Sequence, residues 1–411
     1  MNILFVCPYT PTPIRTRPYN LLRALARRGH SVTLATVWET PDERRALAEW
    51  REAGLQVIAA PLTKGRSLLN MLRTLPTPKP LQAMYCWHPE LWAQIRERLA
   101  ATRLDVCHVE HLRGSEYAVR LKQLGAPVVW DSVDCITMLF ERARRTSRSL
   151  FGRWIPRLEL ARTRRYEGRL VRMFRRVLAT SAEDAAALQQ LARDGVAGGG
   201  PAEAAFGSAV DVLSNGVDLD YFRSRGETRA AETVVFTGKM SYHANTTAAL
   251  SLVEDIMPMV WHSRPDARVE IVGNSPPREL AALASRLAPR VIVTGYVDHV
   301  PPYLCAATVA VAPMAYGAGV QNKILEAMAC ATPVVATPQA TAALEVRAGS
   351  DLLVADSNSG MAGEILRLLA DAALRHKVGL NGRSYVVEHH NWDRIATRLE
   401  GIYQDYVDAA H

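Results

Sequence analysis

The stretch that decides the fold runs from Asn2-Ile-Leu-Phe-Val-Cys7 through Tyr19-Asn-Leu-Leu-Arg-Ala-Leu-Ala-Arg-Arg-Gly29 to Ser31-Val-Thr-Leu-Ala-Thr-Val37. Its middle part places leucines on one helical face, with Pro18 where a first helical turn accepts proline and Gly29 where a helix ends. The two apolar runs have the length of buried strands. A strand, a helix and a strand within about 35 residues form a βαβ unit, which requires parallel strands.

The same alternation continues along the 411 residues, a length that fits two domains of roughly 200 residues each. A glycine-rich stretch from Arg193 to Glu203 is predicted to be a mobile loop near the end of the first domain. We expect an α/β protein with two doubly wound, Rossmann-like domains that face each other across a ligand cleft. Strands are expected at 2–7, 31–37, 55–60, 106–110, 127–131 and 176–180, and then at 233–237, 268–272, 291–294, 308–313 and 333–336.

Positive charge is concentrated in one segment. The formal net charge is +8, yet residues 141–178 alone hold 13 Arg and 3 Glu, so the rest of the chain is nearly neutral. Leu150, Phe151, Trp154 and Ile155 fall at helical spacing among these arginines, a pattern typical of an element that binds an anionic membrane. Alternatively, the aromatic residues are core and the arginines form a solvated or ion-paired face. Nucleic acid is not expected as a partner, because no nucleic-acid-binding module is recognisable.

Cysteine usage and hydropathy point to a cytoplasmic protein. The six cysteines show neither a C-x-x-C pair nor metal-ligand spacing, so buried free thiols in a reducing compartment are expected. The apolar run at residues 3–7 lacks a basic leader and ends at Pro8, which is too short for a signal peptide. No window holds 18 consecutive apolar residues. We therefore predict a cytoplasmic location, with peripheral attachment to the inner face of the membrane as a possibility.

A loop in the second half has the pattern of a phosphate site. Gly317 and Gly319 follow an apolar run, and a helix is predicted to begin near Gln321. The amides and the dipole of a helix N-terminus favour phosphate. Lys323 in the first turn can neutralise a second phosphate charge, and Glu326 on the same face could accept hydrogen bonds from two ribose hydroxyls. The alternative is a solvated ion pair between Lys323 and Glu326.

Two further loops follow expected strands. Gly238 and Lys239 precede a helix that Asn245 or Thr246 is predicted to cap, and Lys239 could stabilise the charge of a leaving diphosphate, unless it is simply solvated.

The loop Val293-Thr-Gly-Tyr-Val-Asp298 leaves its strand through Gly295. Its backbone could pair with the edge of a nucleobase while Tyr296 or Val297 packs on the ring. An ordinary turn is the alternative.

Eight short motifs follow one another along the chain. They are Arg28-Gly-His-Ser-Val-Thr-Leu34, Leu104-Asp-Val-Cys-His-Val-Glu110, Ser214-Asn-Gly-Val-Asp-Leu-Asp-Tyr-Phe222, Ile271-Val-Gly273, Val293-Thr-Gly295, Lys323-Ile-Leu-Glu-Ala-Met328, Arg383-Ser-Tyr-Val-Val387 and Asn391-Trp392. This ordered set resembles the family 4 glycosyltransferases of the GT-B fold, over essentially the whole chain. The resemblance implies an acceptor-binding domain at 1–212, a donor-binding domain at 213–392, and a last helix at about 393–411 that packs back on the first domain.

The resemblance also implies substrates and residue roles. The donor would be a nucleoside-diphosphate sugar and the acceptor a sugar or a lipid-linked sugar. Glu326 would hold the ribose hydroxyls, and Lys239 would take the position of the family's phosphate-binding Arg. The implied donor-binding residues are Gly238, Lys239, Tyr296, Val297, Gly317, Gly319, Val320, Gln321, Asn322, Lys323 and Glu326. No metal or other cofactor is implied, because a helix N-terminus and a lysine take its place.

The implied reaction moves a glycosyl group to an acceptor hydroxyl with retention at the anomeric carbon, so that no enzymic nucleophile is required. The candidate catalytic residues are Lys239, Asp134, Asp131 and His108, and the candidate acceptor-binding residues are Arg15, Arg17 and Glu110. Each polar residue at a strand end of the acceptor domain could equally be structural.

Three positions depart from the family pattern. Ala318 stands where the family commonly has a first glutamate, which resembles a donor-sugar contact. His243 would replace a second basic residue only in part, because its charge varies with pH. Val133 stands in place of the family's His before Asp134. An exopolysaccharide transferase subgroup shares Gly-Val-Gln-Asn-Lys-x-Leu-Glu at the first of these sites, which implies cell-surface polysaccharide or glycolipid assembly.

Other functions stay open at this point. A nucleotide-sugar epimerase also uses two Rossmann-like domains, and the missing first glutamate favours a non-catalytic nucleotide-sugar-binding protein slightly. A NAD-dependent dehydrogenase is disfavoured, because Pro11 and Pro13 stand where a G-x-G-x-x-G would follow the first strand.

Overall fold

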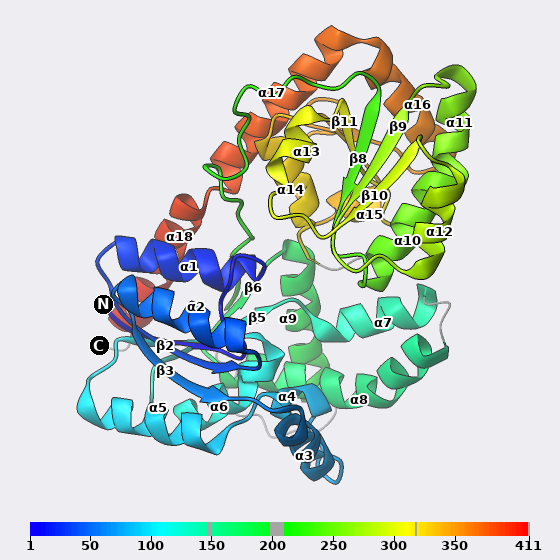
Figure 1. The fold of residues 1–411 in the computed structure, drawn as a ribbon. Helices are drawn as coiled ribbons and strands as arrows, with labels where there is room; N and C mark the ends of the chain where they lie inside the picture. Colours follow the sequence, from blue (N-terminus) through cyan, green and yellow to red (C-terminus); the bar gives the residue numbers. More distant parts are fainter. Residues whose placement is uncertain (147–149, 198–208, 317–318, 410–411) are drawn as a thin grey trace. The chain divides into compact units, whose positions relative to one another are not determined.

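The computed structural model describes residues 1–146, 150–197, 209–316 and 319–409, without the side chains of 143–158, 196–197 and 209. The chain divides into two units, each built on its own sheet (Figure 1). Unit 1 comprises Met1–Ser214 and Trp392–His411, and unit 2 comprises Asn215–Asn391. The last helix therefore belongs to the first unit.

The sheet of unit 1 is parallel throughout, with the strand order β3-β2-β1-β4-β5-β6-β7. Successive residues of its central strand enter opposite cores: Leu4 and Val6 lie in one, and Ile3 and Phe5 in the other. Both faces are therefore buried, which explains the continuous apolar runs in the sequence. The strands are β1 (Asn2–Cys7), β2 (Ser31–Trp38), β3 (Gln56–Pro61), β4 (Val106–Glu110), β5 (Val128–Val133), β6 (Arg176–Ala179) and β7 (Ala209–Val212).

Helices cover the two faces of this sheet. The core with Ile3 and Phe5 includes leucines of α1 and α2 and Trp392, Leu399 and Tyr403 of α18. The helices of unit 1 are α1 (Thr16–Arg27), α2 (Pro41–Glu52), α3 (Lys64–Thr74), α4 (Leu81–Tyr85), α5 (Pro89–Ala101), α6 (His111–Gln123), α7 (Ile136–Thr146), α8 (Leu150–Met173), α9 (Ala182–Ala197) and α18 (Trp392–Asp408).

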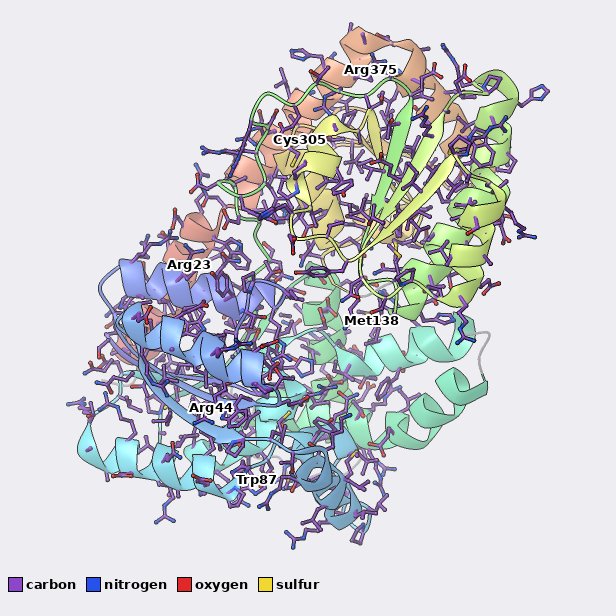
Figure 2. All side chains as sticks on the ribbon, viewed as in Figure 1. Arg23, Arg44, Trp87, Met138, Cys305 and Arg375 are labelled. Carbon is purple, nitrogen blue, oxygen red and sulfur yellow. The ribbon has the colours of Figure 1, made fainter. Side chains whose placement is uncertain are left out.

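Unit 2 repeats the plan around a single core, with the strand order β10-β9-β8-β11-β12-β13. Its strands are β8 (Thr233–Thr237), β9 (Arg268–Val272), β10 (Val291–Gly295), β11 (Val309–Ala312), β12 (Val334–Ala336) and β13 (Leu353–Val354). Its helices are α10 (His243–Ser251), the π-helix η1 (Leu252–Ile256), α11 (Met257–Ser263), α12 (Arg278–Arg286), α13 (Pro301–Ala306), α14 (Asn322–Ala329), α15 (Pro338–Thr341), α16 (Asn358–Ala370) and α17 (Ala372–His389). Figure 2 draws the described side chains of both units, among them Trp87 of unit 1 and Cys305 of unit 2.

The α/β class and the two parallel, Rossmann-like sheets are confirmed, and the eleven expected strands are present within two residues of their predicted ends. Three expectations need correction. Residues 193–197 continue α9 instead of starting a loop, and residues 198–208 lie outside the description. Helix α10 begins at His243, with Tyr242 as its N-cap residue, so Asn245 and Thr246 do not cap it. The short strands β7 and β13 were not predicted.

Each sheet reverses its strand order once. In unit 1 the reversal falls between β1 and β4, and in unit 2 between β8 and β11. Ligands of open α/β sheets bind outside the carboxyl ends of the strands at such a switch point. We therefore built the candidate site from the residues that follow these four strands.

Candidate functional site

Two glycines allow close backbone contact at the switch point of unit 2. Gly238 follows β8 and Gly273 follows β9. A Cβ on Gly273 would lie 1.8 Å from the carbonyl oxygen of Gly238, and a Cβ on Gly238 would lie 2.7 Å from Asn245 Nδ2. The contact at Gly273 is with backbone and requires glycine there, whereas a side chain at Gly238 would displace the Asn245 amide.

The side chain of Asn245 joins two of the predicted donor-binding elements. Its Nδ2 donates to the carbonyl oxygen of Lys239 at 3.0 Å, and its Oδ1 accepts from Lys323 Nζ at 2.7 Å. The ammonium of Lys323 also lies 5.2 Å from the centre of the Phe236 ring. Asn245 thus positions both the Lys239 loop and the Lys323 ammonium, a role that the predicted helix cap did not include.

Lys323 and Glu326 are partly buried on the first turns of α14, and no ion pair joins them among the described residues. Burial lowers the pKa of Lys323 to about 8, against the attraction of Glu326. Burial raises the pKa of Glu326 to about 7, against the attraction of Lys323. The alternative of a solvated ion pair is therefore wrong: Lys323 has the Asn245 amide oxygen as its neutral partner, and neither Lys323 nor Glu326 has an ion-pair partner among the described residues.

The start of α14 offers polar groups beside this pair. Gly319 has a φ of 63°, a left-handed conformation that favours glycine, and Val320 is buried. Gln321 is the N-cap residue. Asn322 Oδ1 is buried and has no hydrogen-bond partner among the described residues. The predicted Gly317, like Ala318, lies outside the described residues.

The remaining donor-side residues are more open to solvent. Lys239 is exposed, Tyr296 is 67% exposed and Val297 is half-buried beyond the end of β10. His243 forms a hydrogen bond through Nδ1 with the hydroxyl of Tyr316. Asn245 thus joins the backbone of Lys239 to the ammonium of Lys323, while Tyr296 is exposed and Val297 packs partly against the core of unit 2.

The switch point of unit 1 centres on Glu110, which is 1% exposed. Cys7 Sγ donates to Glu110 Oε2 at 3.1 Å, across the carboxyl ends of β1 and β4. Burial, reinforced by the charge of Asp131, raises the pKa of Glu110 to about 8. Next to it, the rings of Tyr9 and His111 lie 6.4 Å apart, and burial lowers the pKa of His111 to about 4.

Asp131 and His108 are both 0% exposed and are engaged by other protein groups. Arg17 donates from Nε to Asp131 Oδ2 at 2.9 Å, and a second guanidinium nitrogen lies 2.8 Å from the same oxygen. His108 Nε2 lies 3.4 Å from that oxygen. His108 Nδ1 is hydrogen-bonded to the hydroxyl of Tyr403 at 2.8 Å, and the imidazole stacks on Phe5.

These contacts fix the protonation states of Asp131 and His108. The pKa of Asp131 falls to about 2, because Arg17 and His108 outweigh the effect of burial. Burial lowers the pKa of His108, so its neutral form is favoured. Asp131 and His108 present no atom to solvent here, and their geometry is that of a structural link between α1, the sheet and α18.

Arg15 and Asp134 are the more accessible members of the unit 1 set. Arg15 forms an ion pair with Glu43 at 3.0 Å and lies over the ring of Tyr9 at 4.6 Å. Asp134 accepts from Thr180 Oγ1 at 3.1 Å, and burial raises its pKa to about 6. Before it, Val133 has a φ of 67°, which is strained for a β-branched residue. Strain of this kind gathers at functional loops, and it falls where the family has its histidine.

Half of the eight arginines of the basic segment whose side chains are described form ion pairs. Arg164 pairs with Asp194 at 2.7 Å, and Arg176 with Asp211 at 3.1 Å. Arg142 pairs with Glu183. The side chains of Phe151 and Trp154 lie outside the description.

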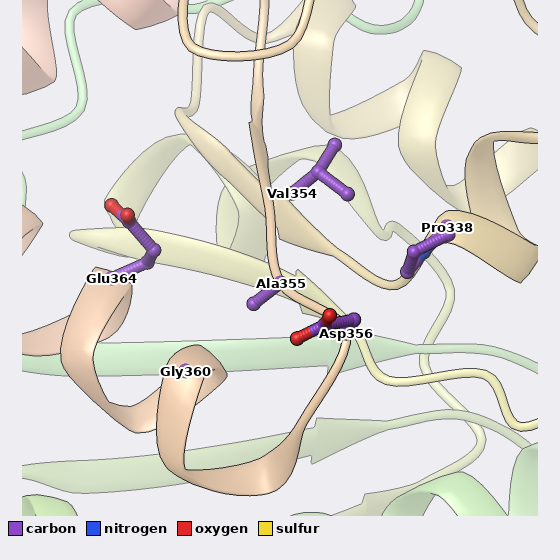
Figure 3. A pocket seen from close by; sticks show the side chains of 6 residues that line it. All are labelled: Pro338, Val354, Ala355, Asp356, Gly360 and Glu364. Carbon is purple, nitrogen blue, oxygen red and sulfur yellow. The ribbon is translucent and has the colours of Figure 1, made fainter.

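A depression of about 370 Å³ lies at another place in unit 2, beside the ends of β12 and β13 (Figure 3). Asp356 and Glu364 are its acidic lining residues. It includes none of the predicted site residues.

All six cysteines are buried free thiols, as expected. Among the described residues, no group of three or more His, Cys, Asp and Glu is arranged to hold a metal ion. No helix in the described ranges has the length and hydropathy to cross a bilayer.

Sequence reasoning missed His111 and Tyr403, and it named Asn245 and Gly273 without their structural roles. His111 and Gly273 each stand directly after a strand, so their position was a usable signal. Tyr403 lies 295 residues from its partner His108, and nothing local in the sequence indicates that contact.

Comparison with known proteins identifies both units. The family model "Glycosyl transferase 4-like domain" matches residues 14–196, and the model "Glycosyl transferases group 1" matches residues 231–371. The phosphatidyl-myo-inositol mannosyltransferase of Mycobacterium leprae is 27% identical over 208 residues, which cover 49% of this chain and 54% of that protein. The chain thus spans about half the length of the curated relatives it matches.

Solved structures share the architecture. HepE of Anabaena, in complex with UDP and glucose, superposes with a TM-score of 0.66 at 16% identity, over 98% of this chain and 100% of that chain. Sucrose-phosphate synthase from Thermosynechococcus elongatus superposes with a TM-score of 0.67 at 17% identity, over 100% of both chains. Likeness at this identity establishes the fold. With two family models that match in order, one in each unit, the chain belongs to the GT4-like glycosyltransferases of the GT-B fold.

Proposed function

We propose that this protein transfers a glycosyl group from a nucleoside-diphosphate sugar to an acceptor hydroxyl, with retention at the anomeric carbon. Unit 2 holds the donor and unit 1 the acceptor. One observation carries the proposal: Lys323 and Glu326 are kept partly buried at a switch point without an ion pair to each other. Groups left unsatisfied in this way gain free energy when a ligand supplies their partners.

The chemistry of a nucleotide sugar fits these residues. The diphosphate supplies negative charge to Lys323, Lys239 and the amides at the start of α14, while the ribose hydroxyls donate to Glu326. Tyr296 or Val297 covers the base. When the bond from the anomeric carbon to the diphosphate oxygen breaks, the lysines and amides stabilise the charge that develops on the leaving diphosphate. No protein nucleophile and no metal ion is needed in this scheme.

The acceptor belongs to the switch point of unit 1 in this proposal. The polar groups there are Arg15, Asp134 and the residues around Glu110. The buried pair of Asp131 and Arg17 holds the neighbouring backbone in place. The name of the mycobacterial relative points to a lipid acceptor, which supports glycolipid or cell-surface polysaccharide assembly at the cytoplasmic face of a membrane. The basic segment 141–178 remains a candidate for contact with that membrane.

Donor binding by Glu326→Gln tests the assignment. Calorimetry with UDP-, GDP-, ADP- and dTDP-sugars identifies the donor, and Glu326→Gln is expected to weaken its binding by roughly 10- to 100-fold, the value of one or two hydrogen bonds to a charged group. Glu364→Gln is the matched control, because Glu364 is an acidic helix residue of unit 2 outside the site. Unchanged nucleotide affinity in Glu326→Gln would refute the donor site.

The products separate the remaining functions. A new glycoside is expected with the wild-type protein, and EDTA should leave its rate unchanged. An epimerised donor would instead identify an epimerase. Donor binding without turnover, across a panel of sugar and lipid-linked acceptors, would identify a binding protein.

A further inference from the structure

Helix α3 is oriented with its polar side chains inward and its leucines outward. Its buried residues are Ser67, Asn70 and Thr74, each at most 3% exposed. The leucines of the opposite face and of the helix end are solvent-exposed: Leu68 by 54%, Leu69 by 39%, Leu72 by 54% and Leu75 by 50%. A helix of a water-soluble surface normally shows the reverse arrangement.

The inward polar face is fixed by hydrogen bonds. Asn70 Nδ2 donates to the carbonyl oxygen of Trp87 at 2.8 Å, and Thr74 Oγ1 donates to the carbonyl oxygen of Asn70 at 2.7 Å. At the helix start, the side chain of Thr63 accepts from the amide of Arg66. Turning the leucines inward would break the bonds from Asn70 to the carbonyl oxygens of Trp87 and Tyr85, whereas the other two bonds lie within the helix and its cap. Asn70 therefore fixes the apolar face at the surface.

The stretch of sequence that contains this face carries charge of one sign. Between residues 53 and 89 the sequence contains no Asp or Glu, and its four basic residues are Lys64, Arg66, Arg73 and Lys79. Lys79 pairs with Glu116 at 2.6 Å. Among the ion pairs of the described residues, none involves Lys64, Arg66 or Arg73, and all three lie on α3. Such a surface fits an anionic bilayer, because the leucines can insert among the acyl chains while the neighbouring cations contact the phosphate groups above them.

The surroundings of α3 favour a broad, flat partner. The helix lies at an edge of unit 1 next to α4 (Figure 1). Arg162 of α8 donates to the carbonyl oxygen of Leu75 at 2.7 Å, which ties the end of α3 to the helix that continues the basic segment. The exposed leucines thus border the most basic part of the chain, instead of standing alone.

We propose that α3 is the membrane-docking element of this protein. Leu68, Leu69, Leu72 and Leu75 enter the boundary between headgroups and acyl chains of an anionic bilayer, and Lys64, Arg66 and Arg73 contact its phosphates. Membrane docking would bring the protein to a lipid-linked acceptor, and its biological purpose rests on the proposed function. The docking itself needs neither donor nor acceptor.

Vesicle flotation of the full chain tests the docking element. Wild-type protein should float with phosphatidylglycerol/phosphatidylcholine vesicles and not with phosphatidylcholine alone. Leu68→Gln/Leu72→Gln should bind at least about tenfold more weakly, since half-exposed leucines gain much of their transfer free energy on insertion. Leu124→Gln/Leu380→Gln, which changes two equally exposed leucines elsewhere, is the matched control and should bind like wild type.

Charge and self-association complete the test. Lys64→Gln/Arg66→Gln/Arg73→Gln should lose about fivefold in affinity for each cation and most of the salt dependence of binding. Equal binding by the leucine variant and the wild type overturns the proposal. So does sedimentation of the wild type as a dimer that the leucine variant dissociates, because a second copy would then cover the face. Donor affinity measured in the same samples should stay at the wild-type value, so a failure of docking is distinguishable from a failure of the donor site.

Discussion

The two units treat two of their carboxylates in opposite ways. In unit 1, the carboxylate of Asp131 on β5 is completely buried and paired with Arg17, and its pKa is about 2. At the switch point of unit 2, the carboxylate of Glu326 has no ion-pair partner among the described residues, and its pKa is about 7. The Asp131 carboxylate is satisfied by protein groups, whereas the Glu326 carboxylate lacks an ion-pair partner, as the proposed donor site requires.

This difference separates stability from binding. A buried ion pair holds structure, because removal of either partner strands a charge. A buried charge without a partner costs stability in the free protein, which a ligand then offsets. Burial alone therefore does not distinguish these two carboxylates, whereas their ion pairing does.

The largest expected effect is on Arg17. Arg17→Met strands the Asp131 carboxylate and should reduce the free energy of unfolding by about 3 to 5 kcal/mol. Lys323→Met should stay within about 1 kcal/mol of wild type, because Lys323 is desolvated without an ion pair. Urea unfolding followed by Trp fluorescence reports on unit 1, which holds all eight tryptophans except Trp261; calorimetry covers unit 2. Equal losses in the two variants would break the comparison.

The pH dependence of stability should differ by a smaller amount. Glu326 has a pKa of about 7 in the folded protein against an ordinary value of 4.5, so its contribution to stability is present below pH 4.5 and is lost as the pH rises through 7. Between pH 5 and pH 7 the wild type should lose about 2 kcal/mol relative to Glu326→Gln. Asp131 has the opposite sign: its lowered pKa stabilises the fold above pH 3.8 and ceases to do so as the pH falls through 2. If the difference in unfolding free energy between wild type and Glu326→Gln does not change with pH, the raised pKa of that carboxyl group is contradicted.

The smallest expected effect is on Tyr403. Tyr403→Phe removes the hydroxyl that is bonded to His108, and the stranded imidazole should cost about 1 to 2 kcal/mol of unfolding free energy. Tyr296→Phe, which removes a hydroxyl from an exposed ring, serves as the control and should be silent in thermal melts. If both variants melt at the same temperature as the wild type, the hydrogen bond between Tyr403 and His108 does not contribute to the stability of unit 1.

Sequence reasoning reached the fold because its signals are local, and the proposed donor residues were chosen from signals of the same kind. The βαβ alternation and the glycine before Lys239 can each be read within a few residues. Contacts between distant residues could not be predicted in this way. Arg17 and Asp131 are 114 positions apart in the sequence, and the order of the strands in the sheet brings them together. The predicted cap at Asn245 was wrong because its side chain is used by Lys239 and Lys323. The two-residue strand β13 is too short to leave a pattern.

The return of α18 to unit 1 has a consequence for biosynthesis. A ribosome releases the sheet strands of unit 1 first, but the core around Phe5 stays open until Leu399 and Tyr403 have emerged, after the whole of unit 2. Until then His108 lacks the hydroxyl of Tyr403, and the part of the sheet that α18 covers is exposed to water. The first unit to be made is therefore the last to be finished, so its folding during translation must wait for the final helix.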